Sequence, residues 1–141
     1  MKTLTKVRRW TWELPQSLLG LLLLPFYKKT LLKVFEYEGQ KVYIYDKFPG
    51  GISLGYYILV DYNRKDWNNK LIRLSLKKSI RHESGHGIQS KWLGPFYLLT
   101  VGILSGVHNI ICRIKNYYGI EYNYYKFFVE RQADKLGKVK R

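Results

Sequence analysis

Five consecutive residues carry the densest chemistry in this sequence: His82, Glu83, Ser84, Gly85 and His86. On a helix, residues four positions apart lie on one face, so both imidazoles point at one place and Glu83 projects beside them. Catalytic zinc sites use three protein ligands and keep a fourth position for water. The spacing therefore predicts a helix that supplies two zinc ligands, His82 and His86. The third ligand has to come from elsewhere in the chain.

The segment that can complete such a site reads Glu-Arg-Gln-Ala-Asp and begins at Glu130, on a helix predicted for residues 122–136. Glu130 can serve as the third ligand, and Asp134, one turn later, can hold a zinc-bound imidazole from behind and fix its tautomer. Ala133 is the only alanine in the chain, and its small side chain would let two helices approach closely. The alternative is a solvated helix face whose charges pair at i, i+4 spacing. Together with the two histidines, the segment favours a Zn²⁺ site.

The two motifs together resemble those of gluzincin metallopeptidases. His-Glu-Ser-Gly-His and Glu-Arg-Gln-Ala-Asp are similar to the H-E-x-G-H and E-x-x-A-D pair of the CAAX prenyl endopeptidase and HtpX-type families, and the short chain is similar to the minigluzincins. The resemblance covers roughly residues 52–137. It implies that His82, His86 and Glu130 bind Zn²⁺ and that Glu83 is the general base and acid of peptide-bond hydrolysis. It also implies that Asp134 supports a zinc ligand.

The same resemblance implies that an edge strand before the active-site helix binds an extended peptide or protein substrate. In this chain that strand falls on residues 51–60. The substrate-binding residues expected there are Gly51, Ile52, Ser53, Leu54 and Gly55. The developing oxyanion needs a hydrogen-bond donor besides the metal. The candidate donors are His108, Tyr117, Tyr118, Tyr122, Tyr124 and Tyr125.

An α+β fold follows from the order of the predicted elements. Residues 34–38 and 41–46 are β-prone stretches around a turn that contains Gly39, and residues 52–60 supply a third strand. Gly55 within that strand marks a bulge or a place where another backbone comes close. A helical pattern runs from Ser75 through Gln89. We therefore expect one domain over residues 1–141, with a small antiparallel sheet, a zincin-like active-site helix, a ligand helix and apolar helical segments alongside.

Two apolar runs in the sequence indicate where in the cell the protein is located. Residues 17–27 lie between basic segments and are too short to cross a bilayer, which takes about 20 residues. We therefore interpret residues 1–30 as a membrane-interface segment, although an ordinary core helix fits as well. Residues 92–112 carry no formal charge and are long enough to span. Their glycine, proline, histidine and asparagine also allow a buried pair of helical segments.

The formal net charge of +15 predicts a polyanionic partner. The long uncharged runs favour an anionic membrane surface over nucleic acid, and the predicted location is at a membrane, on its cytoplasmic side. The single cysteine, Cys112, excludes an internal disulfide and a cysteine-based zinc site. The function expected is that of a small membrane-associated zinc metalloendopeptidase. The alternatives are a non-proteolytic zinc-binding interaction protein on the same fold and a basic nucleic-acid-binding module.

Overall fold

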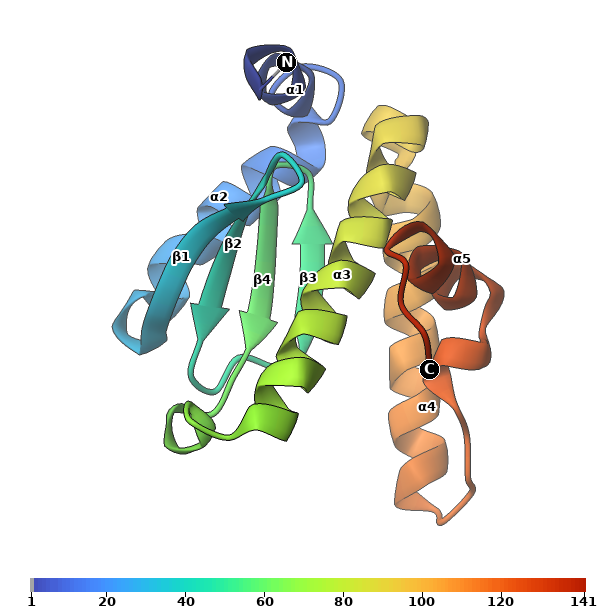
Figure 1. The fold of residues 1–141 in the computed structure, drawn as a ribbon. Coiled ribbons are helices and arrows are strands. Elements are labelled where there is room, and N and C mark those ends of the chain that lie inside the picture. Colours follow the sequence, from blue (N-terminus) through green and yellow to red (C-terminus); the bar gives the residue numbers. More distant parts are fainter. Residues whose placement is uncertain (1) are drawn as a thin grey trace.

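A computed structural model describes residues 2–141. Five α-helices and a four-stranded sheet form the small α+β fold that the sequence predicted (Figure 1). The elements in chain order are α1 (Lys2–Arg9), α2 (Leu14–Tyr27), β1 (Leu31–Tyr37), β2 (Gln40–Tyr45), β3 (Gly51–Leu54), β4 (Tyr57–Asp61), α3 (Lys70–Leu93), α4 (Ile103–Tyr117) and α5 (Phe128–Leu136).

The sheet has the strand order β1-β2-β4-β3 and is mixed, so the prediction of an antiparallel sheet was wrong at its centre. β1 pairs antiparallel with β2, and β3 pairs antiparallel with β4, but β2 and β4 are parallel. The reason is that residues 52–60 do not form one strand. The chain reverses after β2 and again at Gly55, so β3 runs back along the outer edge and β4 returns between β3 and β2.

Gly55 is required at this second reversal. Its φ of +58° lies in the left-handed region that favours glycine. A Cβ at this position would also lie 2.8 Å from the backbone nitrogen of Ser17. The close approach of another backbone, one of the two interpretations of this glycine, is therefore present, and the other backbone belongs to α2.

Helices cover both faces of the sheet, with α3 on one face and α2 on the other (Figure 1). Alternate side chains of a strand point to opposite faces. On β2, Val42 and Ile44 join the core beneath α3, whereas Tyr45 joins the core beneath α2. The strands are apolar on both faces because each face is covered. The sheet is therefore a rigid support for α3.

The N-terminal segment is joined to α3 by buried polar contacts. Arg9 Nη1 donates to Glu13 Oε1 at 2.6 Å and to the carbonyl of Gly87 at 3.0 Å. Gln16 Nε2 donates to the carbonyl of Gly94, directly after α3, at 2.8 Å. The inner face of α2 is thus part of the domain core, as the core-helix interpretation required. Its outer face is exposed, and Phe26 reaches 82% exposure.

Residues 92–112 do not form a buried pair of helical segments. A 3₁₀ turn (Gly94–Phe96) leads into a π-helical turn (Leu98–Gly102) that continues into α4. Leu98–Tyr117 is thereby one helix of 20 residues. Of its apolar stretch, 17% is buried against the rest of the structure. By length and composition alone it could cross a membrane, which is weak evidence for a span. Most of its surface faces away from the rest of the chain.

The boundaries of the two motif helices also differ from prediction. α3 begins earlier than Ser75, because Asn69 caps it by accepting hydrogen bonds from the backbone nitrogens of Leu71 and Ile72. The ligand helix begins at Phe128 and not at residue 122. Asn123 instead accepts a hydrogen bond from the backbone of Tyr125 and starts a separate 3₁₀ turn.

Candidate metal centre and cleft

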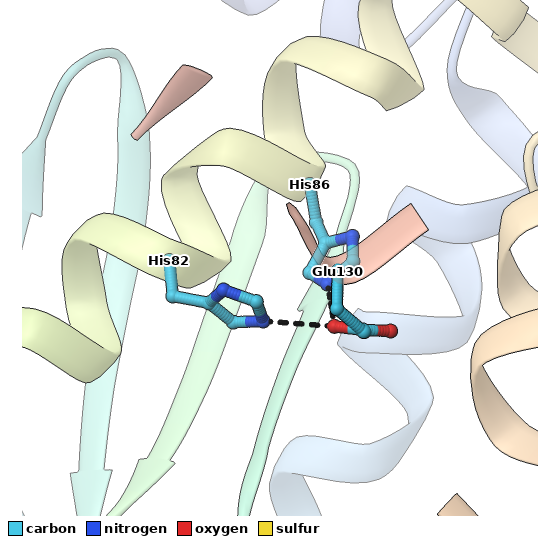
Figure 2. Close-up of side chains that lie close together, drawn as sticks. All are labelled: His82, His86 and Glu130. Carbon is cyan, nitrogen blue, oxygen red and sulfur yellow. Dashed lines mark hydrogen bonds and ion pairs between the residues drawn. The ribbon is translucent and has the colours of Figure 1, made fainter. Parts of the chain in front are cut away.

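Three buried side chains converge between α3 and α5 (Figure 2). His82 and His86 lie on one face of α3, and Glu130 reaches them from the first turn of α5. Glu130 Oε2 lies 3.0 Å from His82 Nε2 and 3.1 Å from His86 Nε2. One ligand atom from each residue lies within 4.8 Å of the other two. Two imidazoles and a carboxylate at these separations could hold a metal ion.

The two helices can approach because small residues meet at their crossing. A Cβ at Gly85 would lie 1.9 Å from the carbonyl oxygen of Ala133, so only glycine fits there. Ala133 is fully buried. The close helix contact expected from this alanine is present, and it brings Glu130 within reach of both histidines.

Each histidine is held from behind by a second side chain. Asp134 Oδ1 lies 2.8 Å from His82 Nδ1, the contact expected from the motif. Gln89 Oε1 lies 2.7 Å from His86 Nδ1. An acceptor at Nδ1 holds the proton there and leaves the Nε2 lone pair free for a metal. Gln89 was not predicted, although a position three residues after His86 lies on the same helix face.

The second carboxylate oxygen of Glu130 is also held. Tyr124 donates its hydroxyl to Glu130 Oε1 at 2.8 Å, and Ser105 on α4 donates to the same oxygen. The hydroxyls of Ser105 and Tyr124 are themselves 2.7 Å apart. These contacts fix the carboxylate so that its other oxygen faces the imidazoles. No local sequence signal points to Ser105, because it reaches the site only through the packing of α4 against α5.

Burial and mutual contact shift the acid-base properties of the cluster. Burial alone would raise the pKa of Glu130, but hydrogen bonds from His82 and His86 outweigh it and hold this pKa below its usual range. Burial alone would lower the pKa of His86, but the contact with Glu130 raises it. For Glu83, burial outweighs the attraction of both imidazoles and raises the pKa. A carboxyl group with a raised pKa beside a candidate metal site is suited to proton transfer.

A cleft of about 590 Å³ opens directly at these residues. His82, Glu83 and His86 line it, together with edge strand β3 and the segment around the start of α4. A Cβ on Gly51 would lie 2.5 Å from Glu83 Oε1, so the backbone of β3 passes close to this carboxylate.

The predicted substrate-binding residues divide into two groups. Four of them line the cleft: Gly51, Ile52, Ser53 and Leu54. Gly55 is not among the lining residues, because it forms the turn that packs against Ser17. The structure therefore places Gly55 outside the cleft lining, at the turn between β3 and β4.

The predicted oxyanion donors are also divided by the structure. Tyr124 and Tyr125 line the cleft. His108 instead stacks on Phe127 with ring centroids 4.0 Å apart, and Tyr122 packs against His108. Tyr117 and Tyr118 are 85% and 73% exposed at the end of α4.

A tyrosine that was not predicted also lies in the cleft. Tyr97 is buried, lines the cleft and donates its hydroxyl to the carbonyl of Ser53 at 3.2 Å. It thereby contacts the edge strand. Its position depends on the turn that follows α3, and no local pattern in the sequence predicts that turn.

No known protein family, curated protein or solved structure matches this chain. The case for a function therefore rests on the residues themselves. Within residues 2–141, these residues form a buried His82, His86 and Glu130 group that could bind a metal ion, beside a carboxyl group and an open cleft.

Proposed function

We propose that this protein is a zinc-dependent metallopeptidase that hydrolyses peptide bonds in its cleft. The observation that carries the proposal is the buried His82, His86 and Glu130 group with Glu83 beside it at the cleft floor. Two imidazoles and one carboxylate are a ligand set that catalytic Zn²⁺ uses. When bound, Zn²⁺ would polarise a carbonyl oxygen and lower the pKa of a bound water to about 7. The resemblance to gluzincin motifs supports the same assignment.

The substrate would bind as an additional strand along the outer edge of β3. Main-chain hydrogen bonds supply affinity in this mode of recognition, so an extended peptide is the expected ligand. Gly51 has no side chain between the edge strand and Glu83. A peptide carbonyl bound beside Gly51 would therefore lie near the Glu83 carboxylate and the two imidazoles.

Glu83 would carry the proton through the reaction. Its carboxylate takes a proton from the attacking water as the water oxygen bonds to the peptide carbonyl carbon. It then gives that proton to the amide nitrogen as the carbon–nitrogen bond breaks, so one water is consumed and a carboxylic acid and an amine are formed. Tyr125 faces the cleft and is the proposed side-chain donor to the developing oxyanion, because the hydroxyl of Tyr124 already donates to Glu130.

The test separates metal binding from proton transfer. Glu83→Gln should retain one equivalent of zinc, because Glu83 is not a ligand, and should lose at least about 100-fold in hydrolysis of unstructured peptides. His86→Ala should lose the zinc itself. Zinc content by mass spectrometry and cleavage of a mixed peptide library measure the two effects.

The matched control is Glu121→Gln, an exposed glutamate outside the cleft. It should keep both zinc and activity. If Glu83→Gln cleaves at the rate of the parent protein, the hydrolytic assignment is wrong. If folded parent protein takes up no zinc, the metal assignment is wrong.

A further inference from the structure

The outer face of α2 is apolar although it is exposed. No charged residue occurs between Leu14 and Tyr27, and the inward positions include the polar and small residues Gln16, Ser17 and Gly20. The large hydrophobic side chains left exposed are Leu14, Leu18, Leu19, Leu21, Leu22 and Phe26. An apolar stripe on the solvent side of a helix indicates a binding surface.

The helix of residues 98–117 has a similar face. Its inward positions include Ser105, His108 and Cys112, which contact α5 or the loop before it. The exposed large hydrophobic side chains are Leu99, Ile103, Leu104, Val107, Ile110, Ile111 and Ile114. This face lies on a different helix from the first, and we refer to the two together as the α2/α4 surface.

The two faces of the α2/α4 surface border one opening. Leu19 of α2 lines the same cleft as Leu98 and Ile103 at the start of α4. In the view of Figure 1, α2 lies behind the sheet, and α4 runs beside α3 with its upper turns behind α5. A ligand that covers the surface would therefore also cover the mouth of the cleft.

The charges around the α2/α4 surface identify its partner. Residues 1–35 contain seven basic residues, and residues 84–120 contain three. The one acidic residue in these two ranges is Glu13, which is fully buried. Lys28 and Lys29 follow α2 directly, and Arg113 and Lys115 lie near the end of α4. Such basic residues beside apolar segments are attracted to anionic lipid headgroups.

Exposed aromatic rings complete the pattern. Trp92 and Phe96 precede the α4 face at 56% and 61% exposure, and Tyr117 and Tyr118 follow it. Tryptophan and tyrosine are enriched where a protein meets the polar boundary of a bilayer. We propose that the α2/α4 surface docks on an anionic lipid bilayer, so that both helices lie in the interface and the cleft opens toward the lipid.

Docking, rather than spanning, follows from the contacts of α4. Ser105 donates to Glu130 in the candidate metal centre, and His108 stacks on Phe127 just before α5. One side of α4 therefore packs against α5 and the residue that precedes it. Moving α4 across a bilayer would either break these contacts or carry α5 into the hydrocarbon. This inference goes beyond the proposed function and requires neither zinc nor catalysis.

Flotation of the purified protein with lipid vesicles tests the proposal. The parent should float with vesicles of equimolar phosphatidylcholine and phosphatidylglycerol and bind much less to phosphatidylcholine alone. The double variant Leu22→Gln with Ile110→Gln removes apolar groups from both faces at positions that are each 58% exposed. Its partition onto the mixed vesicles should fall by about tenfold or more.

The matched control is Leu71→Gln with Leu74→Gln, which are 77% and 53% exposed on α3, across the sheet from α2. It should partition as the parent does. Equal loss in the control, or no loss in the α2/α4 variant, overturns the proposal. So does parent protein that resists extraction by alkaline carbonate, because that is the behaviour of a spanning protein.

Sedimentation without vesicles tests the other occupant considered for the α2/α4 surface, a second copy of the chain. If the parent does not float but forms a dimer that Leu22→Gln with Ile110→Gln dissociates, the surface is a protein interface and the lipid proposal fails. A monomeric parent that floats supports it. Catalytic loss in Glu83→Gln does not bear on either result.

Discussion

Gly51 lies on the edge strand close to Glu83, the carboxylate proposed to carry the proton. A Cβ there would lie 2.5 Å from Glu83 Oε1. Since this oxygen is the far end of a side chain, Glu83 can rotate away at little cost in stability. Rotation would nevertheless remove the carboxylate from the position required for proton transfer.

We therefore expect Gly51→Ala to lower kcat/KM by about tenfold or more while zinc content and melting temperature stay close to those of the parent. Peptide cleavage, metal analysis and thermal unfolding measure the three quantities. Gly106→Ala is the control, because this glycine also lines the cleft and a Cβ there meets nothing within 4 Å. Full activity in Gly51→Ala would show that the position of Glu83 is not critical.

Gln89 has the same relation to His86 as Asp134 has to His82. Its carbonyl accepts from His86 Nδ1, and its amide nitrogen donates to the backbone of Val129 at 3.1 Å. Gln89→Leu keeps a similar volume but removes the acceptor. Loss of such a supporting partner typically costs about 10–100-fold in metal affinity.

Competition with a zinc chelator would measure that loss. Gln132→Leu removes another partner of the Gln89 amide and leaves the bond to His86 in place. It should bind zinc nearly as tightly as the parent. An unchanged affinity in Gln89→Leu would mean that Gln89 does not orient His86.

Sequence alone located the residues of the site whose relation is set by helix periodicity. His82, Glu83 and His86 share one helix, and Glu130 and Asp134 share another, so their spacing carried the information. Ser105 and Tyr97 escaped prediction because each reaches the site from a separate element. Their place depends on how α4 and the turn after α3 pack, which no local pattern encodes.

Among the elements, the N-terminal segment is joined to α3 through a buried ion pair. Glu13 is fully buried, bonded to Arg9 at 2.6 Å, and accepts from Ser90 on α3. Removing one partner of a buried ion pair leaves the other charge uncompensated, which costs about 3–5 kcal/mol. Glu13→Ala should therefore lower the free energy of unfolding by that amount.

Urea denaturation provides the measurement, with Glu121→Gln as the exposed control. The double variant Arg9→Leu with Glu13→Leu should be less destabilised than the sum of its single variants, since it removes both charges together. Additive losses would indicate that the two side chains act independently and that the pair does not hold the segment against α3.

Element boundaries and strand directions were less accessible to prediction than element types. Residues 52–60 are apolar on both faces, so they read as one strand, and the turn at Gly55 depends on the backbone of Ser17 far away in sequence. The parallel pairing of β2 and β4 follows from that turn. The start of the ligand helix was likewise set by Asn123, whose side chain closes a separate turn.

At the scale of the whole molecule, composition and charge carried no information on how the N-terminal apolar run packs. Net charge and uncharged runs favoured a membrane surface, but they did not show that α2 has one face in the core. Polar contacts of Gln16 and Ser17 with distant backbone atoms decide that face. Such contacts are invisible to hydropathy, which sees only an apolar run.

The candidate metal centre joins α3 to α5, so its occupancy should affect the stability of the whole chain. A ligand that binds only the folded state adds about 2.7 kcal/mol at a concentration 100 times its Kd. For a chain of this size, that energy raises the melting temperature by roughly 5–10 °C. Scanning calorimetry with saturating zinc and with a chelator would measure the difference.

His86→Ala provides the comparison, because it removes one ligand and should make the melting temperature independent of zinc. The cluster without metal is still joined by hydrogen bonds that Glu130 accepts from both histidines. The metal-free protein should therefore remain folded and lose only the increment due to zinc. An equal zinc-dependent shift in parent and His86→Ala would place the bound metal elsewhere, and the proposed centre between α3 and α5 would have to be abandoned.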